Sequence, residues 1–259
     1  MKTRFQLPEI YSQLLPEAFW QLSRVEKSAH CADCVMCKSS QKPFLKETKC
    51  CTYSPFLANY LIGGILLSAP SVGQKRIQNK ILYREWALPI GLVASPNYQR
   101  QFQNKSKEDF GRRFDLKCDF YISSSGECAV WKWRDSQCST YFCRYDQPDG
   151  ATFWSQIQTY LYDIELHLAQ LCLLEAGFHQ NEIEENLRWV YLQNEVENQA
   201  FQAEVTALKW TEFWQHQQDR IEEYYKKCYI WVQQNQSQLK LDAEKIFFKH
   251  ESQWNELNR

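Results

Sequence analysis

The C-terminal part of this 259-residue chain lacks the two residues that most often interrupt helices. No Pro occurs after Pro148 and no Gly after Gly177. Within a helix Gly costs about 1 kcal/mol and Pro about 3 kcal/mol relative to Ala, so little in this region opposes helix formation. We therefore predict a mainly α fold in which residues 151–259 form an α-helical hairpin or bundle.

The spacing of apolar residues divides this region into separate helices. From Ile157 the apolar residues follow in steps of four and three, which places one stripe on a helix that Gly177 ends. Asn181 and Glu184 form a variant of the capping box and open a second helix, expected to continue through Phe201 and residues 205–208. A third helix is expected to begin near Thr211, with a shorter continuation around Ile246.

Long apolar segments are also missing. The first 20 residues carry charges and Pro8 where a signal peptide would have its apolar region. The longest apolar run, residues 55–70, contains an Asn and is shorter than the about 20 residues that cross a bilayer. The sequence therefore predicts a cytoplasmic protein without a membrane-spanning segment.

Several enzyme signatures are absent as well. There is no glycine-rich dinucleotide motif, no P-loop, no HExxH and no GxSxG motif, and no cysteine spacing typical of radical S-adenosylmethionine enzymes. Gly63 and Gly64 lie in an apolar run without the context of a phosphate-binding loop, so we expect them to permit close helix packing.

A strong basic excess is lacking, since the formal net charge is -1. Nucleic acid is therefore not indicated as a partner. The near-neutral total is the sum of +9 for residues 1–117, -2 for residues 118–150 and -8 for residues 151–259. Either the basic and acidic parts pack against each other, or a basic surface recruits an anionic partner.

Residues 1–150 are predicted to form a cysteine-cluster domain built from short hairpin and loop elements. Ser54 and Pro55 suit the N-cap and first position of a short helix that continues through Leu67. Between Cys118 and Cys143, a Ser-Ser-Ser-Gly turn separates two short aromatic and β-branched runs, which predicts a small hairpin.

The 11 cysteines are an unusually high number, and nine of them lie between residues 31 and 143. In a reducing cytosol such density indicates metal binding or chemistry rather than disulfides, and the odd total agrees. Thiols separated by two residues converge on one centre in a tight turn. Cys31 is expected to be the spare thiol of the set. The predicted ligand pool is Cys31, Cys34, Cys37, Cys50, Cys51, Cys118, Cys128, Cys138 and Cys143.

The spacing favours an iron–sulfur cluster of the 4Fe–4S type, with zinc as the alternative. Structural zinc modules commonly pair two short C-x2-C knuckles, whereas the second cysteine group here has gaps of nine, nine and four residues. Aromatic residues beside these cysteines suit the apolar surroundings that control potential at a redox cluster. Two of the 11 cysteines, Cys172 and Cys228, fall at helical apolar positions and are expected in the core.

Arg134 is the predicted cofactor-binding residue outside the thiols. A guanidinium four residues before Cys138 is placed to donate hydrogen bonds to thiolates or sulfide and to neutralise cluster charge. The alternative role is a surface ion pair with Asp135 or Asp146. His30 precedes the first cysteine and is either a surface residue or a further ligand.

The segment from Cys128 to Cys143, CAVWKWRDSQCSTYFC, resembles the closing motif of the YkgJ-type cysteine-cluster family of zinc- or iron-chelating domains. The order of features before this motif is also typical of that family: the Cys50-Cys51 pair, then Cys118, then Gly126. The resemblance covers roughly residues 30–175. The resemblance implies a cysteine-held metal centre. Twelve residues separate Cys37 from Cys50, a wider gap than the family usually has, which leaves open which N-terminal cysteines are ligands.

Three functional hypotheses follow. The first is a cytosolic protein that holds an iron–sulfur centre and whose helical tail covers the site or binds a protein partner. The second, since flagellin lysine methylases carry a related cysteine cluster, is a cluster-dependent methyl or redox transferase. The third is a zinc-stabilised adaptor without catalysis.

Overall fold

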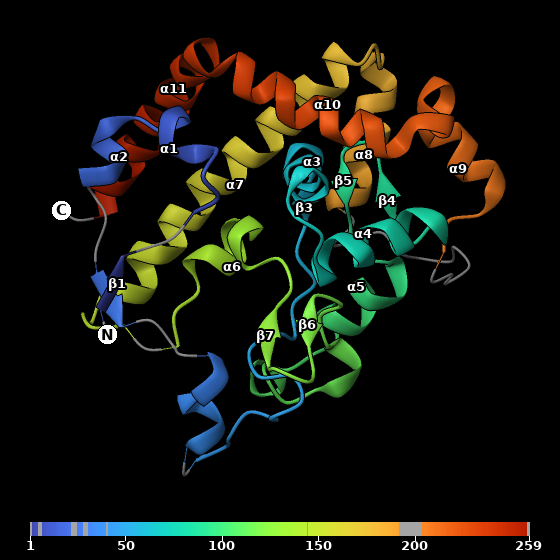
Figure 1. Ribbon diagram of the computed structural model, residues 1–259. Helices are drawn as coiled ribbons and strands as arrows, with labels where there is room; N and C mark the ends of the chain where they lie inside the picture. Colours follow the sequence, from blue (N-terminus) through green and yellow to red (C-terminus); the bar gives the residue numbers. More distant parts are fainter. Residues whose placement is uncertain are drawn as a thin grey trace.

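The computed structural model describes residues 2–4, 7–21, 25–27, 31–39, 41–143, 145–191 and 204–257, and the described chain is mainly helical (Figure 1). The N-terminal region consists of short elements that include a two-stranded antiparallel ribbon of β1 and β2. These elements are β1 (Lys2–Arg4), α1 (Tyr11–Leu14), α2 (Glu17–Gln21), β2 (Val25–Lys27) and the 3-10 turns η1 (Cys31–Asp33) and η2 (Val35–Lys38).

The central region combines helices with two small antiparallel sheets. One sheet has the strand order β3-β5-β4, and the other is a hairpin of β6 and β7. The helices and strands are β3 (Leu57–Ala58), α3 (Asn59–Leu67), α4 (Val72–Leu82), β4 (Ala87–Leu88), β5 (Gly91–Leu92), α5 (Pro96–Gln103), β6 (Tyr121–Ile122), β7 (Glu127–Cys128) and α6 (Ser136–Thr140). The 3-10 turns are η3 (Lys107–Asp109), η4 (Phe114–Leu116) and η5 (Trp131–Trp133).

The C-terminal region is helical, as the absence of Gly and Pro predicts. Its long first helix follows the apolar stripe from Ile157, and Gly177, with φ +86°, takes the left-handed conformation just after the helix end. The helices are α7 (Gly150–Glu175), α8 (Gln180–Tyr191), α9 (Ala207–Trp214), the 3-10 turn η6 (Gln215–Arg220), α10 (Ile221–Gln234) and α11 (Gln236–Leu257). Among the described helices, none is both long and apolar enough to span a membrane.

The core lies where α3 and α7 meet the C-terminal helices. Figure 1 shows α10 and α11 on one side of α3 and α7, with α6 and the β6–β7 hairpin on the other. The buried Asn59 side chain donates to the carbonyls of Pro89 and Ala169 at 3.1 and 3.0 Å. Because Tyr224 donates to the same Pro89 carbonyl at 2.7 Å, helices from both parts of the chain are joined by buried hydrogen bonds.

Close packing at the predicted glycine pair is confirmed. A Cβ built on Gly63 would lie 2.0 Å from the backbone oxygen of Tyr225 in α10. A Cβ on Gly64 would lie 2.2 Å from the ring of Trp133. The absence of a side chain on these residues therefore lets α3 approach α10 on one face and the cysteine region on another.

The helix expected from Ser54 and Pro55 begins later than predicted. Residues Leu57–Ala58 form strand β3, which pairs with Gly91–Leu92, and α3 begins only at Asn59. The prediction from the local capping signal was wrong because residues 57–58 form backbone hydrogen bonds with the distant strand β5 and so cannot join the first turn of a helix. The front region also contains α4 and α5, which the prediction of loops around this helix did not include.

The predicted helices of the C-terminal region differ from the structure in their boundaries. Helix α8 begins at Gln180, and the backbone N–H of His179 donates to Glu182 at 2.7 Å, so Asn181 lies inside the helix and is not its cap. Phe201 lies outside the described residues. Val205 precedes α9 and donates its N–H to Arg84, so the predicted continuous helix through residues 205–208 is wrong.

Candidate metal centre

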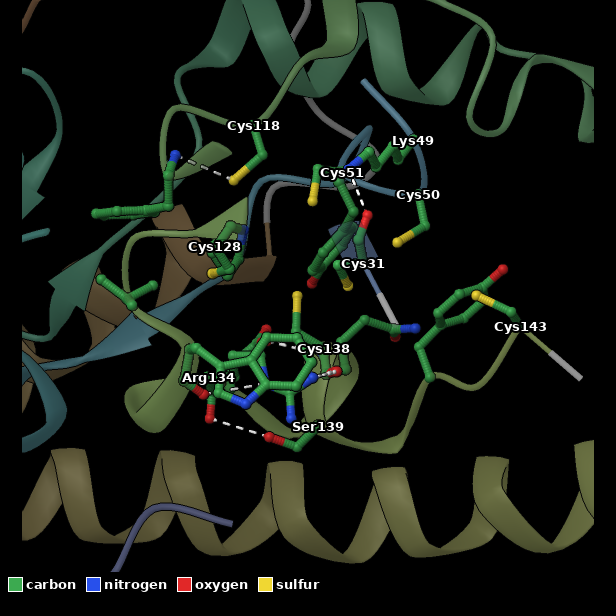
Figure 2. A pocket seen from close by; sticks show the side chains of 18 of the residues that line it. Cys31, Lys49, Cys50, Cys51, Cys118, Cys128, Arg134, Cys138, Ser139 and Cys143 are labelled. Atoms are coloured by element: carbon green, nitrogen blue, oxygen red, sulfur yellow. Dashed lines mark hydrogen bonds between the residues drawn. The ribbon is translucent and has the colours of Figure 1, made fainter. Parts of the chain in front are cut away.

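Seven cysteines of the predicted pool line one cavity of about 560 Å³ (Figure 2). They come from the 3-10 turn η1, from the loop before β3, and from the region between η4 and α7. Figure 2 shows the sulfurs of Cys51 and Cys138 pointing toward each other from opposite walls. The seven are Cys31, Cys50, Cys51, Cys118, Cys128, Cys138 and Cys143.

Backbone hydrogen bonds join the two cysteine groups of the sequence. The N–H of Cys118 donates to the carbonyl of Cys51 at 2.8 Å, which fixes the second group against the first. Cys128 lies on β7, opposite Tyr121 in the predicted hairpin, which the structure confirms. Cys138 lies in α6, whose N-cap Asp135 accepts the Cys138 N–H at 2.9 Å.

The remaining two cysteines of the pool, Cys34 and Cys37, are not among the residues lining the cavity. The N–H of Cys37 donates to the carbonyl of Cys34 at 3.1 Å in a tight turn, as the two-residue spacing predicts. The sequence set Cys31 aside as the spare thiol, whereas in the structure Cys31 lines the cavity. His30, the other candidate in this segment, lies outside the described residues.

Two cationic side chains also line the cavity. Arg134, the residue singled out from the sequence, donates from Nη1 to the carbonyl of Cys138 at 3.0 Å and lies 3.6 Å from the Trp131 ring centroid. Lys49 donates from Nζ to the carbonyls of Cys31 and Gly126, the latter at 2.8 Å. Lys49 therefore connects the first cysteine to the turn of the β6–β7 hairpin.

Sequence reasoning did not identify Lys49, although the residue directly precedes the Cys50-Cys51 pair. Its backbone has φ +51°, an uncommon conformation for a residue with a side chain. That conformation depends on the loop around it, so the sequence carries no signal for it. The adjacency of a Lys to two candidate thiol ligands was the one observable that could have found it.

Burial holds several of these thiols in the neutral form in the absence of a bound cation. Desolvation raises the pKa of Cys118 to about 12, and it also raises the pKa of Cys138 and of Cys128. For Cys50, the hydrogen bond with Cys51 is the main cause of a raised pKa, followed by burial. A bound metal reverses this effect because a coordinating thiol is deprotonated.

The spacing of the thiols bears on the kind of group that fits the cavity. Among the described residues, no three His, Cys, Asp or Glu side chains form a group able to hold a single metal ion. The seven thiols instead line the walls of a space of about 560 Å³. Besides the seven thiols, the lining includes the carboxyl-bearing Asp135 and the cationic Arg134 and Lys49.

A buried carboxyl group supports the wall that carries Cys138. Glu165 of α7 accepts hydrogen bonds from the backbone N–H and the hydroxyl of Ser136 at 2.7 and 2.8 Å. Burial raises the pKa of Glu165, and the neighbouring Asp135 raises it further. Burial also raises the pKa of Asp135 to about 6. The wall of the cavity thus rests on two neighbouring buried carboxyl groups.

We expect Glu165 to make the free energy of unfolding fall as the pH rises above about 4.5, the ordinary pKa of a Glu carboxyl. A carboxyl whose folded pKa is raised binds a proton in the folded state that the unfolded chain has released, so stability is lost with rising pH, by up to about 1.4 kcal/mol per pH unit. In Glu165→Gln this fall is expected to be smaller. Urea denaturation at several pH values measures the slope.

The control for this experiment is Glu175→Gln, which changes an exposed carboxyl on the same helix. Its stability should show the same pH dependence as the unchanged protein. The slope is the readout, because Glu165→Gln also places an amide donor opposite the Ser136 donors and lowers stability at every pH. An unchanged slope in Glu165→Gln would contradict the prediction.

The site was also compared with known proteins. No family model, curated protein or solved structure matches this chain. Membership of the YkgJ-type family stays a prediction from the motif between Cys128 and Cys143. The assignment of a function therefore rests on the residues of the cavity.

The two other cysteines are where the sequence placed them. Cys172 in α7 and Cys228 in α10 are 2% and 4% exposed, and the Cys172 thiol donates to the Cys228 carbonyl at 3.8 Å. Both pack within the hydrophobic core. The prediction that these residues are core cysteines is confirmed.

Proposed function

We propose that this protein holds an iron–sulfur cluster in the cavity lined by the seven cysteines. The observation that carries the proposal is that thiols from three separate segments of the chain line one cavity. When bound, such a cluster supplies one-electron transfer. Cys34 and Cys37 remain outside the proposed ligand set.

The surroundings of the thiols support a redox cluster over a structural zinc ion. Tyr53, Phe110, Phe120, Trp131 and Phe142 contribute aromatic surface to the cavity lining. Apolar walls limit the access of water and thereby influence the potential and lifetime of a cluster. The seven available thiols also exceed the four that one tetrahedral zinc ion uses.

Arg134 and Lys49 have the charge that the proposed group requires. Four thiolates carry four negative charges, and two half-buried cations in the cavity wall offset part of that charge. The Arg134 guanidinium lies over the Trp131 ring and donates to the Cys138 carbonyl. Its lowered pKa results from burial, and the neighbouring thiols act in the opposite direction.

The resemblance to the YkgJ-type family agrees with this proposal. Cys128, Arg134, Cys138 and Cys143, the residues that carry the resemblance, all line the cavity. We accordingly propose a 4Fe–4S cluster as the first candidate and zinc as the second. A methyl or redox transfer reaction at the cluster would require a substrate or second cofactor bound beside it.

Metal analysis of protein purified without oxygen tests the proposal. We expect a brown protein with a broad absorbance at about 400 nm, iron and acid-labile sulfide in similar amounts, and an electron paramagnetic resonance signal in one of two redox states. The metal content is measured by elemental analysis on the same sample. A colourless protein with stoichiometric zinc would overturn the iron–sulfur assignment and favour the adaptor hypothesis.

A further inference from the structure

A second hollow, of about 980 Å³, shares a wall with the cysteine cavity. Tyr53, Phe110, Gln137 and Tyr141 line both spaces. We call this second hollow the aromatic groove. The remaining lining residues come from the segment before β3, the loop between β5 and α5, α5 itself, the residues after α5, α7 and α8. Its volume is that of a pocket for a small organic ligand.

Flat aromatic surfaces dominate the groove. The rings of Tyr98 and Phe102 on α5 stack, with centroids 5.9 Å apart and an interplanar angle of 18°. Tyr53 contacts Phe102 with centroids 5.7 Å apart. On the shared wall Phe110 and Tyr141 pack at 5.3 Å. Side chains of this kind bind planar ring systems by stacking, with little dependence on the identity of the ring.

The charge of the groove has one sign. Lys105 and Lys107 line the groove, and no Asp or Glu is found among the described residues that line it. The Lys105 ammonium lies 3.7 Å from the Phe102 ring centroid. A ligand stacked on this part of the groove would therefore have a positive charge beside its ring, which favours an anionic substituent.

We propose that the aromatic groove binds a mononucleotide, that is, a planar heteroaromatic ring system carrying a phosphate group. The ring system lies against the aromatic wall formed by Tyr53, Tyr98 and Phe102, and the phosphate lies toward Lys105 and Lys107. This inference rests on the proposed function, since the shared wall would place the bound ring next to the cluster. Flavin mononucleotide and adenosine monophosphate share this chemistry.

The test is isothermal titration calorimetry of the anaerobically purified, metal-loaded protein with each nucleotide in turn. We expect at least one of the two nucleotides to bind. Preference for flavin mononucleotide would assign a redox ring to the groove, and preference for adenosine monophosphate an adenosine-containing ligand. No heat of binding from either nucleotide at concentrations up to about 1 mM would overturn the proposal.

Two variants separate stacking from charge. Phe102→Leu keeps an apolar side chain but removes a ring face, and we expect about a tenfold weaker affinity. Lys105→Gln with Lys107→Gln should weaken binding about tenfold and reduce its dependence on salt. The matched control is Lys75→Gln with Lys240→Gln, two exposed lysines outside the lining of the groove, which should bind like the unchanged protein. Equal affinities in the groove variants and the control would contradict the proposal.

The iron content of each sample separates this inference from the proposed function. Nucleotide binding by a protein without iron would support the groove and overturn the cluster. An iron-loaded protein that binds neither nucleotide would support the cluster and overturn the groove.

Discussion

Replacing Cys138 by Ser is expected to lower the iron content of anaerobically purified protein by about tenfold, with a matching loss of absorbance at about 400 nm. Cys138 points into the cavity from α6, opposite Cys51 (Figure 2). Its position is fixed by the Asp135 cap, by Arg134 on its carbonyl and by Glu165 behind the helix. These contacts hold the Cys138 thiol in place on this wall of the cavity.

Two control variants make the result specific. Cys172→Ala removes a thiol that is buried in the helical core and should leave iron content unchanged. Cys37→Ser changes a thiol of the predicted pool that does not line the cavity, and its iron content should also be close to that of the unchanged protein. Iron retained in full by Cys138→Ser would remove this thiol from the ligand set.

Circular dichroism distinguishes loss of the cluster from loss of the fold. Helices α3, α7, α10 and α11 form a core, and none of them contributes a described residue to the lining of the cavity. We therefore expect Cys138→Ser to retain its helical signal. A variant without iron and without helical signal would show that cluster binding and folding of the whole chain are coupled.

Gly63→Ala is expected to lower the free energy of unfolding by about 2–4 kcal/mol. A Cβ at this position would lie 2.0 Å from the carbonyl oxygen of Tyr225 and 2.9 Å from the Cβ of Tyr229. Ala favours an isolated helix over Gly by about 1 kcal/mol, but relief of this clash requires α3 and α10 to separate. The steric term therefore outweighs the gain in helix propensity.

Urea denaturation, followed by circular dichroism, measures this loss. Leu67→Ala is the control, since Leu67 is on the same helix with 48% of its surface exposed, and its change should stay within about 1 kcal/mol. Gly64→Ala should have a smaller effect than Gly63→Ala because its added Cβ meets a Trp133 side chain, not backbone. A Gly63→Ala protein as stable as the unchanged one would contradict the close packing of α3 on α10.

The ring of Trp133 connects this packing to the cavity. Trp133 also contacts Tyr229 of α10, with ring centroids 5.6 Å apart, and it precedes Arg134 in the chain. A shift of α3 away from α10 would therefore displace the segment that carries Arg134. Iron content measured on Gly63→Ala shows whether the helical core holds the cavity in shape.

The sequence by itself determined the features that depend on local chemistry. The absence of Gly and Pro in the C-terminal region predicted its helices, because little there opposes regular backbone hydrogen bonding. The turn with Gly126 predicted the β6–β7 hairpin, since Gly adopts its positive φ without steric cost. The apolar setting of Gly63 and Gly64 predicted a close helix contact.

The features that depend on contacts between distant parts of the chain were decided only by the tertiary structure. The pairing of Leu57–Ala58 with Gly91–Leu92 moved the start of α3, since a ladder partner over 30 residues away overrode the local cap. Seven of nine candidate thiols line one cavity, with Lys49 beside them, because the fold brings three distant segments together. The spacing of cysteines along a chain indicates which thiols can share a turn. The walls of a cavity depend instead on how distant segments pack together, which the spacing does not reveal.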